Sequence, residues 1–108
     1  MSSVNSVLYC NATPDFDDID IDNHNLCKEK LEKKILFYKK KRKKIKAVIV
    51  TDFAGYPADW QQFLKLKKKY NFQLVNDNCH AMGASYNDSK HYASRYADAV
   101  SISFHAVK

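Results

Sequence analysis

The stretch AVIVTDFAGYPADW, residues 47 to 60, decides the fold of this 108-residue chain. Its first seven residues form a β-branched, apolar run, which is typical of a strand buried on both faces. Gly55, Tyr56 and Pro57 then predict a turn, and Asp59 is placed to cap the N-terminus of a following helix. A buried strand, a turn and a capped helix in succession are the repeating unit of a parallel α/β sheet.

The sequence on both sides continues this alternation, with apolar residues at helical spacing or in short strand-like runs. The predicted helices comprise residues 3–10, 26–44 and a segment after Asp59 with Trp60, Phe63, Leu64 and Tyr70 on its apolar side. The predicted strands comprise residues 14–22, 47–53, 72–75 and 99–104, with a loop before the last of them. The segment at 14–22 holds five aspartates, which makes it a poor central strand. The whole order predicts a mostly parallel sheet with right-handed crossovers and flanking helices.

Ligands of such sheets bind beyond the carboxyl ends of the strands. That rule selects Thr51 to Tyr56, Asn76 to His80, and the residues that follow Ser103. Asp77 and His80 are three residues apart, so a helical turn there would point both side chains the same way. Such a carboxylate suits a positive ring nitrogen, whereas the plainer alternative is a turn-capping aspartate and a packed histidine. Lys108 and Ser103 taken alone indicate no more than a solvated terminus and a hydroxyl at a strand end.

The charge of the chain is uneven. Its net charge is +6, and residues 28 to 46 hold eleven of its eighteen basic side chains. This run is either a solvated helix face or, as an alternative function, a small basic module that binds nucleic acid or another anionic polymer. No nucleic-acid module is recognisable, so we favour the solvated face and expect no nucleic-acid partner.

The cysteines and the apolar runs of the sequence bear on the cellular compartment of the protein. Cys10, Cys27 and Cys79 lack the spacing of a zinc or redox motif, although Cys79 beside His80 leaves a thiol nucleophile or metal ligand as a minor alternative. Unpaired thiols favour a reducing cytoplasm. No signal peptide is recognisable, and no apolar run reaches the ~20 residues of a membrane span. We therefore expect neither a metal nor a membrane partner.

Three motifs in order give a more specific signal. DFAGYPAD (52–59), VNDNCHAMGASY (75–86) and DAVSISFHAVK (98–108) resemble the nucleotide-sugar aminotransferases of the DegT/StrS family. These are pyridoxal-phosphate enzymes of the fold-type-I, aspartate-aminotransferase-like class. The segment SSVNSVLYCNATPDFDDIDIDNHNL (2–26) is also similar, so the resemblance covers nearly the whole chain except the lysine-rich run.

The resemblance implies a role for each matching residue. Lys108 aligns with the lysine whose amine binds the cofactor covalently and then shuttles the proton. Asp77 aligns with the carboxylate that pairs with the pyridinium nitrogen, and His80 with a position against the cofactor ring. Ser103 aligns with a hydroxyl that binds the cofactor phosphate. Within the family, His80, the DFAG turn and SFHAVK resemble the subgroup that aminates UDP-linked 4-keto-6-deoxy-N-acetylhexosamines toward pseudaminic acid, with glutamate as donor.

Two residues depart from the family pattern. Asp17 stands at a usually apolar strand position, and Asn76 stands where many members have glutamate, a change that we expect to be tolerated. The family also has segments before and after the matching part. Residues 1–108 are therefore expected to be the central piece of the cofactor-binding large domain of a homodimeric enzyme. Without the N-terminal part and the small C-terminal domain, this piece alone is expected to be inactive, and a catalytically dead, truncated chain is the corresponding alternative.

Overall fold

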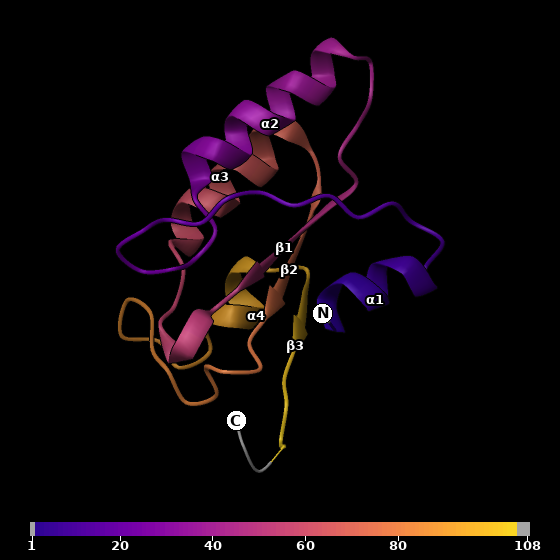
Figure 1. Ribbon diagram of the computed structural model, residues 1–108. Coiled ribbons are helices and arrows are strands. Elements are labelled where there is room, and N and C mark those ends of the chain that lie inside the picture. The colour runs from indigo at the N-terminus through magenta and orange to yellow at the C-terminus, as the bar shows by residue number, and fades with distance from the viewer. Residues whose placement is uncertain (1, 106–108) are drawn as a thin grey trace.

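A parallel sheet of three strands lies at the centre of the computed structural model, which describes residues 2–105 (Figure 1). The strands are β1 (Ala47–Thr51), β2 (Gln73–Asp77) and β3 (Ala99–Ser101), and their order in the sheet is β1-β2-β3. Ala47 pairs with Gln73, and Val75 pairs with Ala99, both in parallel register. The prediction of an α/β fold with a parallel sheet and flanking helices is therefore confirmed.

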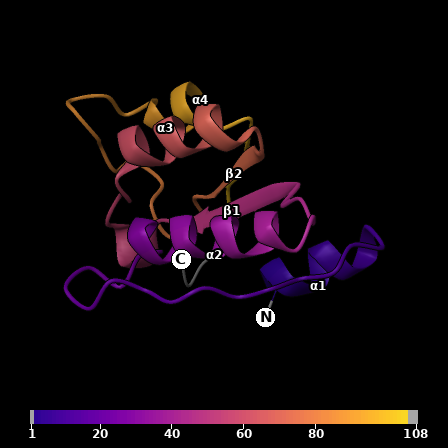
Figure 2. The same ribbon diagram turned by 90° about the horizontal axis from the view of Figure 1, so that it is seen from above.

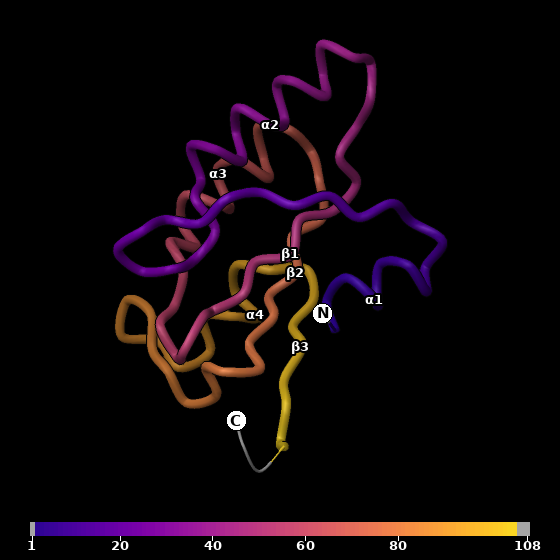
Figure 3. Tube along the Cα trace, in the orientation of Figure 1, coloured from indigo at the N-terminus to yellow at the C-terminus, as the bar shows by residue number. Residues whose placement is uncertain are grey.

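Two helices precede the first strand, and from β1 onward strands and helices alternate. The helices are α1 (Ser2–Tyr9), α2 (Lys28–Lys40), α3 (Trp60–Tyr70) and α4 (Tyr92–Tyr96), with a short 3-10 turn, η1 (Phe53–Gly55), between β1 and α3. The trace in Figure 3 follows this path from α1 through the sheet to β3. Each helix of the described part of the chain is too short or too polar to cross a membrane.

The core lies on one face of the sheet. Side chains alternate between the two faces of a strand, and Val48, Val50 and Leu74 all point to the same face. The buried side chains packed with them come from three helices: Leu31 and Ile35 of α2, Trp60, Phe63 and Leu66 of α3, and Tyr92 of α4. The apolar side of α3 was predicted with Leu64 and Tyr70 on it, but Leu66 is buried and those two are only half-buried.

The opposite face of the sheet is open by comparison. Figure 2 shows α3 and α4 on one side of β1 and β2, and α1 on the other. The side chains that alternate with the core residues, such as Ile49 and Asp77, are only half-buried. Helix α1 has no buried residue, and the hydroxyl of Ser3 ties it to this face by a hydrogen bond to Asp77.

The predicted strand at residues 14–22 is wrong. Within the described residues, this segment forms only an isolated antiparallel bridge between Ile19 and Leu26. The carboxylates of Asp15, Asp17 and Asp18 each accept a hydrogen bond from the next backbone amide. Aspartate side chains that bind backbone amides in this way compete with a strand ladder. The sheet of the described residues therefore has three strands and not four.

The other differences are in the lengths of elements. Helix α2 is shorter than predicted because the chain leaves the helix at Lys41 and reaches a left-handed conformation at Arg42 (φ 55°). β3 ends at Ser101 and not at residue 104, while β2 runs two residues beyond its predicted end. The segment predicted as a loop before β3 contains helix α4, whose five residues are too few to show a helical period.

The capping role predicted for Asp59 is confirmed. Its carboxylate accepts from the amide of Gln62 in the first turn of α3 and also from the Tyr86 hydroxyl, at 3.0 Å. Replacing Asp59 with alanine is expected to lower the free energy of unfolding by about 1 kcal/mol, because it leaves a helix-end amide without its acceptor. Urea unfolding measures this change. Asp59→Asn keeps a capping oxygen and serves as the control, so equal losses in the two variants would contradict the capping role.

Candidate functional site

Three polar side chains meet at the carboxyl ends of the strands. Thr51, Asp77 and Ser101 are paired across β1, β2 and β3, so they form one row at this edge of the sheet. Because Thr51 and Asp77 alternate with the buried residues of β1 and β2, the row lies on the open face. The structure thus brings together the ends of strands that the sequence separates by about 25 residues each.

The carboxylate of Asp77 is held in place by two donors. Ser3 of α1 donates its hydroxyl to Oδ2 at 3.0 Å, and the amide of Cys79 donates to Oδ1 at 3.3 Å. The side chain is half-buried, on the open face at the end of β2. A fixed, negatively charged acceptor in this position fits a ligand that presents a positive ring nitrogen.

His80 lies at the surface beside a different neighbour. Asp77 is the last residue of strand β2, and a turn closed by the hydrogen bond from the Ala81 amide to the Asn78 carbonyl follows it. The helical turn from Asp77 to His80, on which their common orientation was conditional, is therefore not formed. The imidazole instead lies near the ring of Phe53, with 6.3 Å between the ring centroids.

Beyond β3, the chain continues from the same edge of the sheet. The hydroxyl of Ser103 accepts a hydrogen bond from the amide of His105 at 3.3 Å, and Ser103 is half-buried. The Ser101 hydroxyl lies 3.5 Å from the sulfur of Cys79. Lys108, the predicted covalent attachment point, lies outside the described residues.

Sequence reasoning missed the most connected side chain, Asp52. It is fully buried, directly after β1, and both carboxylate oxygens accept hydrogen bonds. The donors to Oδ1 are the Ala58 amide at 2.8 Å and the Trp60 indole at 3.0 Å; the donors to Oδ2 are Asn76 at 3.0 Å, Asn78 at 2.9 Å and the Tyr92 hydroxyl at 2.8 Å. This single carboxylate joins the turn after β1, the start of α3, the end of β2 and α4.

The Asp52 network also explains one departure from the family pattern. Asn76 is fully buried and donates its amide to Asp52. A glutamate at this position would place a second carboxylate beside the first in a buried site, where like charges repel strongly. Burial, and secondarily the hydrogen bond to Asp52, raises the pKa of Tyr92 far above its usual range, so this hydroxyl remains a donor. The amide nitrogen of Asn76 thus matches the Asp52 carboxylate, whereas its oxygen is buried without a hydrogen-bond partner among the described residues.

Comparison with known proteins assigns the family. The family model for the DegT/DnrJ/EryC1/StrS aminotransferases matches residues 1–108, the whole chain. The chain belongs to this aminotransferase family.

Two similar curated relatives have names that contain a nucleotide-linked sugar. The chain is 37% identical over 107 residues to the UDP-4-amino-4,6-dideoxy-N-acetyl-beta-L-altrosamine transaminase of Campylobacter jejuni, covering 99% of this chain and 27% of that protein. It is 30% identical over 104 residues to GDP-perosamine synthase of Escherichia coli O157:H7, and this match covers 96% of this chain and 26% of that protein. The chain thus spans about a quarter of the length of the curated relatives that it matches.

Solved structures of aminotransferases share the fold. Helicobacter pylori PseC, an aminotransferase involved in the biosynthesis of pseudoaminic acid, superposes with a TM-score of 0.81 at 30% identity, over 97% of this chain and 26% of that one. DesI, solved in the presence of its TDP-sugar product, superposes with a TM-score of 0.83 at 26% identity. This match covers 99% of this chain and 25% of the DesI chain. The predicted family and fold are confirmed by these findings.

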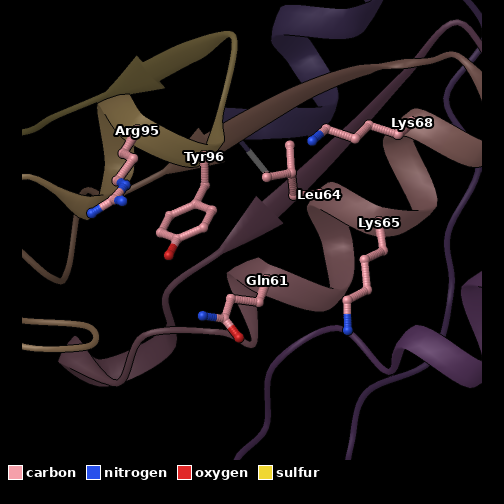
Figure 4. Close-up of a pocket in the computed structure, with 6 residues that line it drawn as sticks. All are labelled: Gln61, Leu64, Lys65, Lys68, Arg95 and Tyr96. Carbon is pink, nitrogen blue, oxygen red and sulfur yellow. The ribbon is translucent and has the colours of Figure 1, made fainter.

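Two open hollows flank the elements of this aminotransferase fold. One, of about 400 Å³, lies beside η1 and is lined by Asp22, Asn23, His24, Phe53, Ala54 and Tyr56. The other, of about 370 Å³, lies between α3 and α4 and is lined by Gln61, Leu64, Lys65, Lys68, Arg95 and Tyr96. Figure 4 shows Tyr96 of α4 facing Gln61 and Leu64 of α3 across this second hollow.

Among the described residues, no cluster of three or more His, Cys, Asp or Glu side chains is arranged to hold a metal ion.

Proposed function

We propose that these 108 residues form the central part of the cofactor-binding large domain of a sugar aminotransferase. The enzyme transfers an amino group from glutamate to a UDP-linked 4-keto-6-deoxy-N-acetylhexosamine, a step in the biosynthesis of pseudaminic acid. The observation that carries the proposal is Asp77, a hydrogen-bonded carboxylate on the open face of the sheet at the end of β2. Family membership and the C. jejuni transaminase, with its UDP-linked sugar, support the reaction and the substrate.

The residues of the site fit pyridoxal phosphate. When bound, this cofactor supplies an electron-withdrawing ring that eases the loss and gain of a proton at the carbon bearing the amino group. Asp77 would hold the positively charged ring nitrogen, since its carboxylate is an acceptor with a fixed position. Ser103 would donate its hydroxyl to the phosphate, and the His80 imidazole would pack along the ring. The Lys108 amine would hold the cofactor and move the proton.

The partners follow from the same proposal. The nucleotide sugar and glutamate are the two substrates, and the complete enzyme is a homodimer. We place it in the cytoplasm, because the three cysteines are free thiols and a reducing compartment keeps them so.

A labelling experiment on the complete protein tests the role of Lys108. We expect borohydride reduction in the presence of pyridoxal phosphate to attach the cofactor irreversibly to Lys108, as peptide mass spectrometry will show. Lys108→Ala should lose the label, whereas Lys90→Ala, a control at another lysine, should keep it. A label on any other lysine of the wild-type protein would overturn the proposed attachment.

Substrate choice is tested separately. With glutamate as donor, the complete enzyme should aminate the UDP-linked 4-keto sugar with a higher kcat/KM than its TDP- or GDP-linked counterparts. A preference for the GDP-linked sugar would retain the aminotransferase but refute the proposed substrate.

A further inference from the structure

Three aromatic rings from three separate segments form a row next to the candidate site. The ring centroids of His24 and Phe53 are 6.0 Å apart, and those of Phe53 and His80 are 6.3 Å apart. His24 belongs to the loop before α2, Phe53 to η1, and His80 to the turn after β2. The row begins at the residue assigned to the cofactor ring and leads away from it along the hollow beside η1.

The segment that carries Phe53 is held rigidly by a buried amide. Asn25 is only 3% exposed; its oxygen accepts from the Phe53 amide at 2.9 Å, and its nitrogen donates to the Tyr56 carbonyl at 3.0 Å. Gly55 has a φ of +83°, and a Cβ there would lie 3.3 Å from the carbonyl oxygen of His80. The turn is therefore fixed against its neighbours before any ligand arrives, which lowers the entropic cost of binding.

The rings on this fixed turn are exposed to solvent. Phe53 is 46% exposed and Tyr56 is 62% exposed, whereas the aromatic residues of the core, such as Trp60 and Phe63, are fully buried. Rigid aromatic side chains that line a hollow offer a flat, apolar surface on which a ligand can pack. The hollow of about 400 Å³ is large enough for a single six-membered sugar ring.

The charge around the hollow decides which part of a nucleotide sugar fits. Within residues 2–105, its lining contains the exposed carboxylate of Asp22 and the amide of Asn23 but no lysine or arginine. A carboxylate repels a diphosphate and accepts hydrogen bonds from hydroxyl groups. By contrast, the hollow between α3 and α4 carries Lys65, Lys68 and Arg95 (Figure 4), and its lining includes none of the three rings of the row.

We propose that the hollow beside η1 is the subsite for the hexose ring of the nucleotide sugar, an inference that rests on the proposed function. The apolar C–H face of the sugar packs on the Phe53 and Tyr56 rings, because both present flat apolar surface to the hollow. Asp22 accepts a hydrogen bond from a sugar hydroxyl. The diphosphate and the nucleobase extend outside the hollow, away from this carboxylate.

The test uses the complete enzyme with its cofactor and compares Phe53→Ala with Phe16→Ala, a change of another exposed phenylalanine. Phe53→Ala should raise the KM for the nucleotide sugar about tenfold, since losing a stacked ring weakens binding by roughly that factor. The affinity for UDP alone and the rate of the glutamate half-reaction should remain within twofold of the wild type. Phe16→Ala should change none of these quantities.

Two further variants keep the test decisive. Phe53→Leu retains apolar volume if the alanine variant fails to fold, and it should still raise the KM because the flat ring is lost. Asp22→Asn should raise the KM without changing UDP binding. An unchanged KM in both Phe53 variants would overturn the subsite, and so would an equal loss of UDP affinity, which would place the nucleobase in the hollow. If either result is obtained while borohydride reduction still attaches the cofactor to Lys108, only the sugar subsite is refuted. If the cofactor is attached to another residue, the proposed function is refuted.

Discussion

Replacing Asp52 with asparagine is expected to lower the free energy of unfolding by about 4 kcal/mol. The carboxylate accepts five hydrogen bonds at a fully buried position, and an amide has only one oxygen to offer them. Whichever way the amide is oriented, at least two buried donors lose their acceptor and face an N–H group. Each buried group left unsatisfied costs about 1–3 kcal/mol, and a loss of this size is exceptional for one substitution.

Urea unfolding of the complete protein measures the Asp52 effect. Asp88→Asn is the matched control, because Asp88 is exposed and has a positive φ that asparagine also tolerates. The control should remain within about 0.5 kcal/mol of the wild type. If Asp52→Asn were no more destabilising than the control, the network would not hold the turn, α3, β2 and α4 together as the structure indicates.

Replacing Asp77 with asparagine is expected to lower the turnover of the complete enzyme roughly 10³-fold, the usual scale for removing a preorganised charge from an active site. Asparagine has nearly the same shape as aspartate. The substitution therefore removes the negative charge that would hold the ring nitrogen and changes little else. The cofactor should still be trapped on Lys108 by borohydride.

A second variant, Ser3→Ala, distinguishes the effect of the Asp77 charge from the effect of the hydrogen bond that holds its carboxylate. Ser3→Ala removes the hydrogen bond from the Ser3 hydroxyl to the Asp77 carboxylate but leaves the charge, so its turnover should fall only by about tenfold. Single-turnover kinetics with glutamate measure both variants. Turnover of Asp77→Asn within threefold of the wild type would refute the assigned role of Asp77.

The sequence predicted those features that depend on neighbouring residues. The β-branched run before Asp52, the turn at Gly55 and the cap at Asp59 are local signals, and each corresponds to an observed element. The rule for the carboxyl ends of parallel strands then located Asp77 at the correct edge of the sheet. The roles of Lys108, Ser103 and His80 toward a cofactor stay predictions.

The features that the sequence did not predict depend on residues far apart in the chain. Tyr92 reaches Asp52 across 40 positions, and no local pattern pairs them. Asn25 holds the turn at Phe53 from 28 positions away for the same reason. The mistaken strand at 14–22 has a different cause: its aspartate side chains accept hydrogen bonds from the backbone amide of the next residue and so compete with a strand ladder.

The slender attachment of α1 has a consequence for the motion of the site. Segments with little buried surface open locally at a small free-energy cost, without unfolding the rest of the molecule. Each such opening of α1 separates the Ser3 hydroxyl from the Asp77 carboxylate and removes that hydrogen bond. Since coupling between two sites is reciprocal, any molecule that steadies α1 also steadies Asp77, and a ligand that engages Asp77 makes α1 harder to open.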